Sequence, residues 1–125
     1  MQDEFRTLPD AELAVMQALW DCGGAAKRIE IQKKLGSTHP MAPTTLLTLL
    51  SRLADKGFLA AEKTGRMTQY RPLVAREAYL ARQGSRFYHK LCGGSLPAFA
   101  SALCASGLSA QELEELRRLL KEGTL

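Results

Sequence analysis

The 125-residue sequence has few cysteines and no long apolar run. Cys22, Cys92 and Cys104 include no CxC or CxxC pair, which excludes a disulfide framework and a zinc ribbon and favours a reducing compartment. No stretch approaches the roughly 18 apolar residues of a membrane helix, and the acidic, polar opening MQDEFRTLPD does not resemble a secretory signal. We therefore expect a cytoplasmic protein of one domain's length, with no membrane as partner.

The sequence also lacks the residue sets that most enzyme sites need. No Ser/His/Asp set, acid–base pair of carboxylates or glycine-rich phosphate loop is recognisable. His89 and Cys92 lie one helical turn apart, but two ligands do not make a metal site. We expect neither an enzyme nor a metal ion or other cofactor.

Basic residues are concentrated in the middle third of the chain. Residues 27–71 carry nine basic against three acidic side chains, a net charge of +6, whereas residues 1–26 are net −4 and residues 72–125 net +2. A concentrated positive charge favours a polyanion such as nucleic acid or an acidic membrane surface. A solvated charged face explains this charge distribution equally well.

Hydrophobic periodicity predicts helices at about 8–21, 26–35 and 43–56. We expect Thr7 to cap the first helix, and Ile29 and Leu35 to point inward from the second. Lys27, Arg28, Lys33 and Lys34 lie on the outer side of the second helix.

The third helix has the most regular pattern. Its leucines at i, i+3, i+4 and i+7 predict a buried stripe: Leu46, Leu49, Leu50 and Leu53. The side chains expected on the opposite face and its flanks are Thr44, Thr45, Leu47, Thr48, Ser51, Arg52 and Asp55. Threonine is a poor helix former, so three threonines on one side require a reason other than helix stability.

A β-hairpin is expected next, from residues 58–63 and 68–72 joined by a glycine-containing turn. Pro72 is expected to make the second strand an edge strand. Three short helices followed by a hairpin form the outline of a winged helix-turn-helix, so we interpret residues 1–73 as a DNA-binding domain. The fold class is mainly α with a small β-hairpin wing.

Residues 74–125 predict three further helices, at about 75–91, 95–105 and from Ser109 onward, where Ser109 and Glu112 form a capping box. Their apolar residues predict a contact surface: Leu80, Phe87, Leu91, Leu96, Phe99, Leu103, Leu116 and Leu120. Three such helices have too little core to stand alone, so we expect a homodimer through this region. Packing of the same residues within one chain is the alternative.

Five segments resemble the penicillinase and methicillin-resistance repressor family (the BlaI/MecI type, which includes copper-responsive repressors). They are LPDAELAVMQALW (8–20), APTTLLTLLSRLADKGFLAAEKTGR (42–66), YRPLVAREAYL (70–80), GGSL (93–96) and LSAQELEELRRLL (108–120). The resemblance is collinear over about residues 8–122. It implies a winged helix that binds a palindromic DNA operator, a C-terminal dimerisation region, and repression of transcription that a signal relieves.

With that resemblance, helix-turn-helix geometry places the first turns of the third helix in the major groove and the hairpin against the backbone or the minor groove. The expected DNA contacts are Thr44, Thr45, Leu47, Thr48, Arg52, Lys63 and Arg66. The threonine methyls and Leu47 can pack on thymine methyl groups.

The sequence departs from the family at two positions of this helix. Thr44 stands where the family usually has lysine, and Leu47 where it has a second basic residue. Each lost phosphate contact lowers the salt slope of binding by about one unit. We expect weaker or differently targeted DNA binding. The alternative is a winged-helix protein-interaction adaptor that has lost DNA binding.

The family's known release signals do not carry over to this sequence. Antibiotic-responsive members are cleaved at an Asn-Phe bond, and Ser101-Ala102 stands at that place here. Copper-responsive members carry C-terminal CxC pairs, whereas Cys92 and Cys104 are isolated. A sensor protease stays among the partners that the resemblance allows, and a redox switch at these cysteines is a minor alternative.

Overall fold

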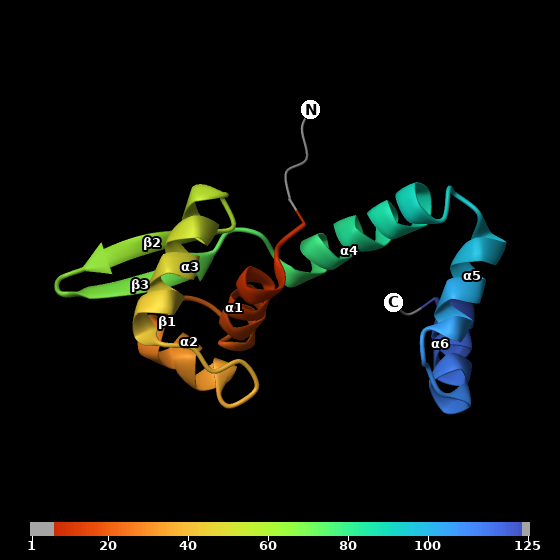
Figure 1. Cartoon of the computed structure of the whole chain (residues 1–125), viewed down its shortest axis with the longest axis horizontal. Helices are drawn as coiled ribbons and strands as arrows, with labels where there is room; N and C mark the ends of the chain where they lie inside the picture. The colour runs from red at the N-terminus through yellow and green to blue at the C-terminus, as the bar shows by residue number, and fades with distance from the viewer. Residues whose placement is uncertain (1–6, 124–125) are drawn as a thin grey trace. The chain divides into compact units, whose positions relative to one another are not determined.

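The computed structural model describes residues 7–123 and divides into two compact units on either side of the Gln83–Gly84 bond (Figure 1). The elements of the first unit are α1 (Asp10–Asp21), β1 (Ala26–Lys27), α2 (Arg28–Leu35), α3 (Pro43–Asp55), β2 (Leu59–Thr64), β3 (Met67–Pro72) and the first part of α4 (Arg76–Arg86). The second unit holds the end of α4, a π-helical turn η1 (Phe87–Leu91), α5 (Leu96–Ala105) and α6 (Ala110–Glu122).

The core of the first unit lies between α1, α2, α3 and the base of the hairpin. Its largest fully buried side chains include Met16, Leu19, Ile31 and Phe58. The leucine stripe predicted for α3 is confirmed, because all four of its leucines are buried in this core. The burial of this stripe fixes the rotation of α3 about its own axis and turns its threonines outward.

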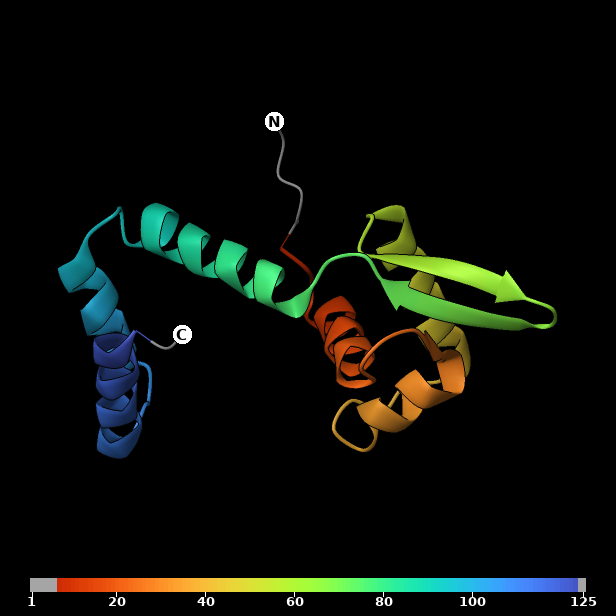
Figure 2. The same ribbon diagram turned by 180° about the vertical axis from the view of Figure 1, so that it is seen from behind.

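The sheet has three antiparallel strands in the order β1-β3-β2, and the β2–β3 hairpin extends beyond the three helices (Figures 1 and 2). The prediction that Pro72 marks an edge strand is wrong, because β3 is the central strand. Strand β1 pairs only with Gln69 and Tyr70 of β3. Pro72 lies beyond this paired segment, so the N–H that proline lacks is not needed for a hydrogen bond to β1. Helix α2 also begins two residues later than predicted, since Ala26 and Lys27 form β1.

Two further predictions about the helices are wrong. Helix α1 begins after Pro9 without a side-chain cap, and the Thr7 hydroxyl instead donates to Oε1 of Gln83 at 3.2 Å. Ile29 is 53% exposed, and Ile31 occupies the core. Ile31 and Leu35 are four residues apart and therefore share the buried face of α2, whereas Ile29 lies about 200° around the helix from Ile31.

A buried ion pair joins α1 to the end of α3. Glu12 is 4% exposed, and its carboxylate pairs with the ammonium of Lys56, the residue that caps the C-terminal end of α3. A buried carboxylate without a partner is strongly unfavourable, so this pair ties the C-terminal end of α3 to the first helix.

The first unit extends past residue 73 because the start of α4 packs on α1. Val74 and Tyr79 are buried in the core. The indole N–H of Trp20 donates to the carbonyl of Val74 at 2.9 Å, and the backbone N–H of Leu8 donates to the Tyr79 hydroxyl at 3.0 Å.

The second unit has no buried residue in its described part, 84–123. Aromatic rings pack within it, since the ring centroid of Phe99 lies 5.6 Å from that of Phe87 and 5.7 Å from that of Tyr88. The capping box predicted for the last helix is confirmed, because Ser109 accepts from the N–H of Glu112 at 3.0 Å and the Glu112 carboxylate accepts from the N–H of Ser109 at 2.9 Å. Among the helices within residues 7–123, none combines the length and the hydropathy that a membrane span requires.

Candidate nucleic-acid interface

The outward face of α3 carries the polar side chains that the sequence assigns to DNA. Thr44, Thr45, Thr48 and Arg52 are all exposed. Pro43 occupies the first turn, where its missing N–H costs no helical hydrogen bond, so α3 starts directly before the threonines. The four side chains are thus presented together on a helix whose opposite side is anchored in the core.

The hydroxyl of Thr48 is engaged with its own helix. It donates to the carbonyl oxygen of Thr44 at 3.1 Å. With its proton used in this way, the hydroxyl oxygen can only accept a further hydrogen bond. Amino groups of adenine and cytosine are the donors that the major groove offers, whereas phosphates are acceptors. In this conformation Thr48 presents an acceptor, which matches the amino groups of a base edge.

The hairpin presents two exposed cations. Lys63 lies near the end of β2, and Arg66 follows Gly65 in the turn. Gly65 has φ +66°, the left-handed conformation that this tight turn requires. Within residues 7–123, no carboxylate forms an ion pair with either cation.

Arg71, also on the hairpin, is already neutralised. Its guanidinium donates to Oε2 of Glu62 at 2.8 Å across the hairpin. This hydrogen bond, together with the attraction of the two charges, holds the pKa of the Glu62 carboxyl below its usual range. The positive charge that the hairpin offers a polyanion is therefore concentrated at Lys63 and Arg66.

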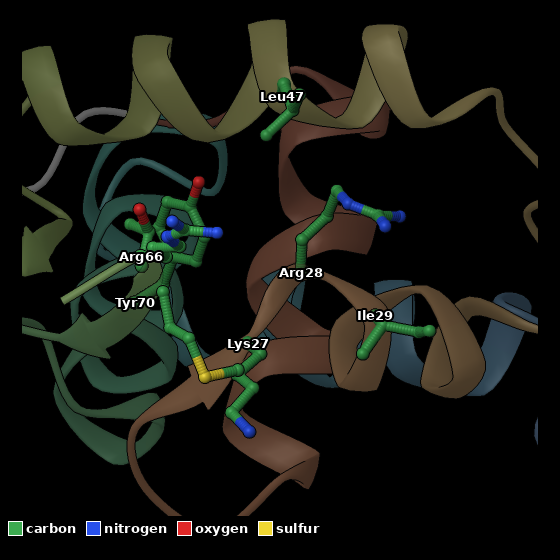
Figure 3. Close-up of a pocket in the computed structure, with 8 residues that line it drawn as sticks. Lys27, Arg28, Ile29, Leu47, Arg66 and Tyr70 are labelled. Atoms are coloured by element: carbon green, nitrogen blue, oxygen red, sulfur yellow. The ribbon is translucent and has the colours of Figure 1, made fainter. Parts of the chain in front are cut away.

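A hollow of about 350 Å³ opens between α2, α3 and the hairpin (Figure 3). Its lining residues are Lys27, Arg28, Ile29, Leu47, Arg66, Met67, Thr68 and Tyr70. The structure thus brings together Leu47 of α3 and Arg66 of the hairpin, two residues that the sequence assigns to DNA from separate elements. Met67 was not among the residues predicted to contact DNA, and Ile29 was predicted to lie in the core.

The residues predicted to dimerise divide between the two units. Leu80 lies in the first unit and is 58% exposed. In the second unit, Leu91, Leu96 and Leu120 are exposed. The others are half-buried: Phe87, Phe99, Leu103 and Leu116.

The cysteines and histidines form no chemical centre in the part of the chain that the structure describes. No three His, Cys, Asp or Glu residues within it lie close enough together to hold a metal ion. Burial raises the pKa of the Cys22 thiol, an effect that the nearby Lys34 partly offsets. Its thiolate is therefore disfavoured at neutral pH, which opposes a reactive role.

Comparison with known proteins places nearly the whole chain in one family. The family model described as "Penicillinase repressor" matches residues 8–122. The penicillinase repressor of Bacillus licheniformis is 32% identical over 116 residues, which cover 92% of this chain and 90% of that protein.

Two solved structures of BlaI match more than half of the chain. The solution structure of the DNA-binding domain of the repressor BlaI is 34% identical, with a TM-score of 0.52, and the match covers 63% of this chain and 94% of that one. The monomeric form of Bacillus licheniformis BlaI in complex with the blaP half-operator is 35% identical, with a TM-score of 0.50, covering 59% and 89%. The chain belongs to the penicillinase repressor family.

Proposed function

We propose that this chain is a cytoplasmic transcriptional repressor that binds a palindromic DNA operator as a homodimer, and that it acts by binding and not by catalysis. The observation that carries the proposal is the threonine face of α3, which a fully buried leucine stripe turns outward in a member of the penicillinase repressor family. The similar BlaI chain in complex with a half-operator supports DNA as the partner of this fold.

The exposed residues divide by chemistry into base-reading and backbone-contacting groups. Thr44, Thr45 and Thr48 lie on the early turns of α3, which a helix-turn-helix protein places against base edges. Arg52, Lys63 and Arg66 carry charges suited to phosphates, so they fix the position of the protein on the duplex without reading its sequence.

The second unit supports the homodimer. An apolar helical segment with no buried residue in its described part is not stable as an isolated body in water. A second copy covers the same residues symmetrically, and the twofold axis of such a dimer matches a palindromic operator.

We propose that the signal that releases the operator acts on this second unit. The Ser101–Ala102 bond, which stands where antibiotic-responsive relatives are cut, lies inside α5. A sensor protease remains a proposed partner for release, but the Asn-Phe sequence that is cut in those relatives is not retained at this bond.

The proposal is tested by selecting duplexes from a random-sequence pool and then footprinting the protein on the selected duplex. We expect two protected half-sites related by a palindrome, with centres about 10 base pairs or a multiple of that apart. The absence of sequence-specific protection at low salt and micromolar protein contradicts it. A tight protein partner in pull-downs, with no salt-dependent DNA affinity, favours the adaptor alternative instead.

A further inference from the structure

A second pocket, of about 650 Å³, opens between α1 and the part of α4 that belongs to the first unit. We call it the α1–α4 pocket. Its two ends are marked by polar contacts between the helices. At one end the Asp21 carboxylate pairs with Arg76, and at the other the Thr7 hydroxyl, just before α1, donates to Gln83. The volume lies within the range of about 300–1,000 Å³ that small-molecule sites occupy.

The wall between the two ends is largely apolar. Leu13 and Trp20 of α1 are half-buried, and Leu80 of α4 is exposed. The ring of Tyr79 lies 5.9 Å from that of Trp20 and completes this wall. Leu80, which the sequence groups with the dimerisation residues, thus lines a pocket of the first unit. An occupant with an aromatic body covers this wall favourably, because aromatic rings bury large apolar areas and pack well against one another.

The charges of the pocket disfavour an anion. Its only cation is Arg76, which is neutralised by Asp21 at 2.5 Å and lies over the ring of Trp20. Asp10 also lines the pocket, and within residues 7–123 it forms no ion pair. The pocket therefore carries one negative charge that its own residues do not balance, and charge complementarity favours a cationic occupant.

Gln83 lacks a hydrogen-bond partner that an occupant can supply. Its Oε1 accepts from the Thr7 hydroxyl at 3.2 Å, whereas its buried Nε2 has no partner in the described part of the chain. Buried polar atoms are nearly always paired, and an amide nitrogen only donates, so the missing partner is an acceptor. Gln83 lines the pocket, and a rotation of its amide presents this donor to an occupant. Asp10 follows Thr7 by three residues, so the acceptor and the positive charge are needed at the same end.

We propose that the α1–α4 pocket binds a small amphipathic cation. The aromatic body of this ligand packs between Trp20 and Leu80, and its head places a protonated amine beside Asp10 and a neighbouring hydroxyl or carbonyl oxygen beside Gln83. The pocket contains none of the residues assigned to DNA, so the inference stands independently of the proposed function.

The probe is L-phenylalaninol, which has a phenyl ring, an amine and an adjacent hydroxyl. Trp20 is the only tryptophan of the chain, so the intrinsic fluorescence of the full-length protein reports directly on this pocket. We expect saturable binding with a dissociation constant of about 1 mM or below, as for other ligands of about eleven non-hydrogen atoms. The absence of a fluorescence change at about ten times that concentration overturns the proposal.

Two analogues test the charge. A diol in which a hydroxyl replaces the amine should bind about three- to fivefold more weakly, because it loses the ion pair with Asp10. Phenyllactate, an anion of the same shape, should bind more weakly still. If phenyllactate binds as well as phenylalaninol, the assignment of a cation is wrong.

Asp10→Asn should abolish the preference for the amine over the diol without weakening binding of the diol. Asp10 also stabilises the N-terminus of α1 through the helix dipole, but a loss of helix stability alone does not change this ratio. The control is Glu77→Gln, which removes an exposed carboxylate from the first turn of α4 outside the pocket and should keep the preference. An Asp10→Asn protein with the wild-type preference contradicts the position of the amine.

Gln83→Leu tests the hydrogen bond with a side chain of similar size. The wild type should prefer phenylalaninol over the matching amine without a hydroxyl by about fivefold, the value of one neutral hydrogen bond. The variant should bind the two amines equally. A preference that is equal in the wild type and the variant means that Gln83 does not recognise the head. These titrations contain no DNA, so failure of operator binding would leave their outcome unaffected.

Discussion

At the scale of single residues, Thr48 is the side chain whose chemistry is most narrowly defined. Its hydroxyl donates to the carbonyl of Thr44, so in the proposed DNA complex it would act as a hydrogen-bond acceptor. This property came from the structure, whereas its place on the exposed face followed from the leucine spacing alone. Helical periodicity predicts which way a side chain points, but not how its proton is used.

Thr48→Ala should relax the sequence preference of the operator at one base pair and leave folding intact. The lost contact is worth about 1 kcal/mol, and alanine is the better helix former on this exposed face. Repeating the random-pool selection with the variant measures the change. Ser85→Ala, an exposed substitution in α4, is the control. An unchanged preference in the Thr48 variant would mean that a different face of the protein reads the bases.

Leu47→Lys should strengthen binding at low salt and increase the salt slope by about 0.9. The reason is that position 47 lies on the flank of α3 beside Arg66, where a basic side chain can reach a phosphate. Binding isotherms between 50 and 200 mM salt measure the slope. Leu73→Lys makes the same change at a residue that is 51% exposed and outside the hollow. Equal slopes for the two variants would contradict a specific role for position 47.

At the scale of elements, the sequence predicts what periodicity alone can specify. Helix α3 was predicted to within one residue at its C-terminal end, because four of its 13 residues are leucines at helical spacing. Helix α2 has eight residues, too few for the pattern to separate Ile29 from Ile31, and Ile29 was assigned to the wrong side. Strand β1 has two residues and exists through its pairing with β3, which local sequence does not encode.

The hollow illustrates the same limit. Its lining comes from α2, α3 and the hairpin, and only the folded chain brings Arg28, Leu47 and Met67 together. The sequence predicts that the helix and the hairpin each carry charge toward a polyanion. It does not predict that Ile29 and Met67 line this hollow, because the two residues belong to no recognisable stripe.

The ion pair between α1 and α3 gives a test at this scale. Lys56→Ala leaves the Glu12 carboxylate buried without its partner and should lower the free energy of unfolding by about 2–3 kcal/mol, somewhat less than for a fully buried pair because Lys56 is partly exposed. Urea unfolding followed by circular dichroism measures it. The double variant Glu12→Gln, Lys56→Met should recover most of the loss. If the double variant is as unstable as Lys56→Ala, the cost lies in packing and not in the unpaired charge.

At the scale of the whole molecule, the two units differ in how they are stabilised. The first has a buried core that extends from Leu8 to Tyr79, whereas the second, within residues 84–123, has helices with good caps but no buried side chain. Caps such as Ser109 contribute about 1 kcal/mol each and set where helices begin, but they do not hold helices together. The large apolar residues of the second unit therefore need a partner surface, which is the basis for proposing a homodimer.

The sharpest test of that dimer uses a residue that the monomer does not need. Leu120 is 58% exposed, so Leu120→Asp removes little packing within one chain, whereas burying the new carboxylate at a twofold interface is strongly unfavourable. We expect monomers by analytical ultracentrifugation, with the urea midpoint of the first unit unchanged. Operator affinity should fall about 10²- to 10⁴-fold, because two half-sites are then bound independently.

Leu103→Asp and Phe87→Asp should act alike, but Phe87 also contacts Phe99 in its own chain, so Leu120 gives the cleaner result. Leu73→Asp, on the first unit, should stay dimeric. A Leu120→Asp protein that also remains dimeric would place the interface elsewhere, and half-sites bound with full affinity by a monomer would remove the reason for a palindrome.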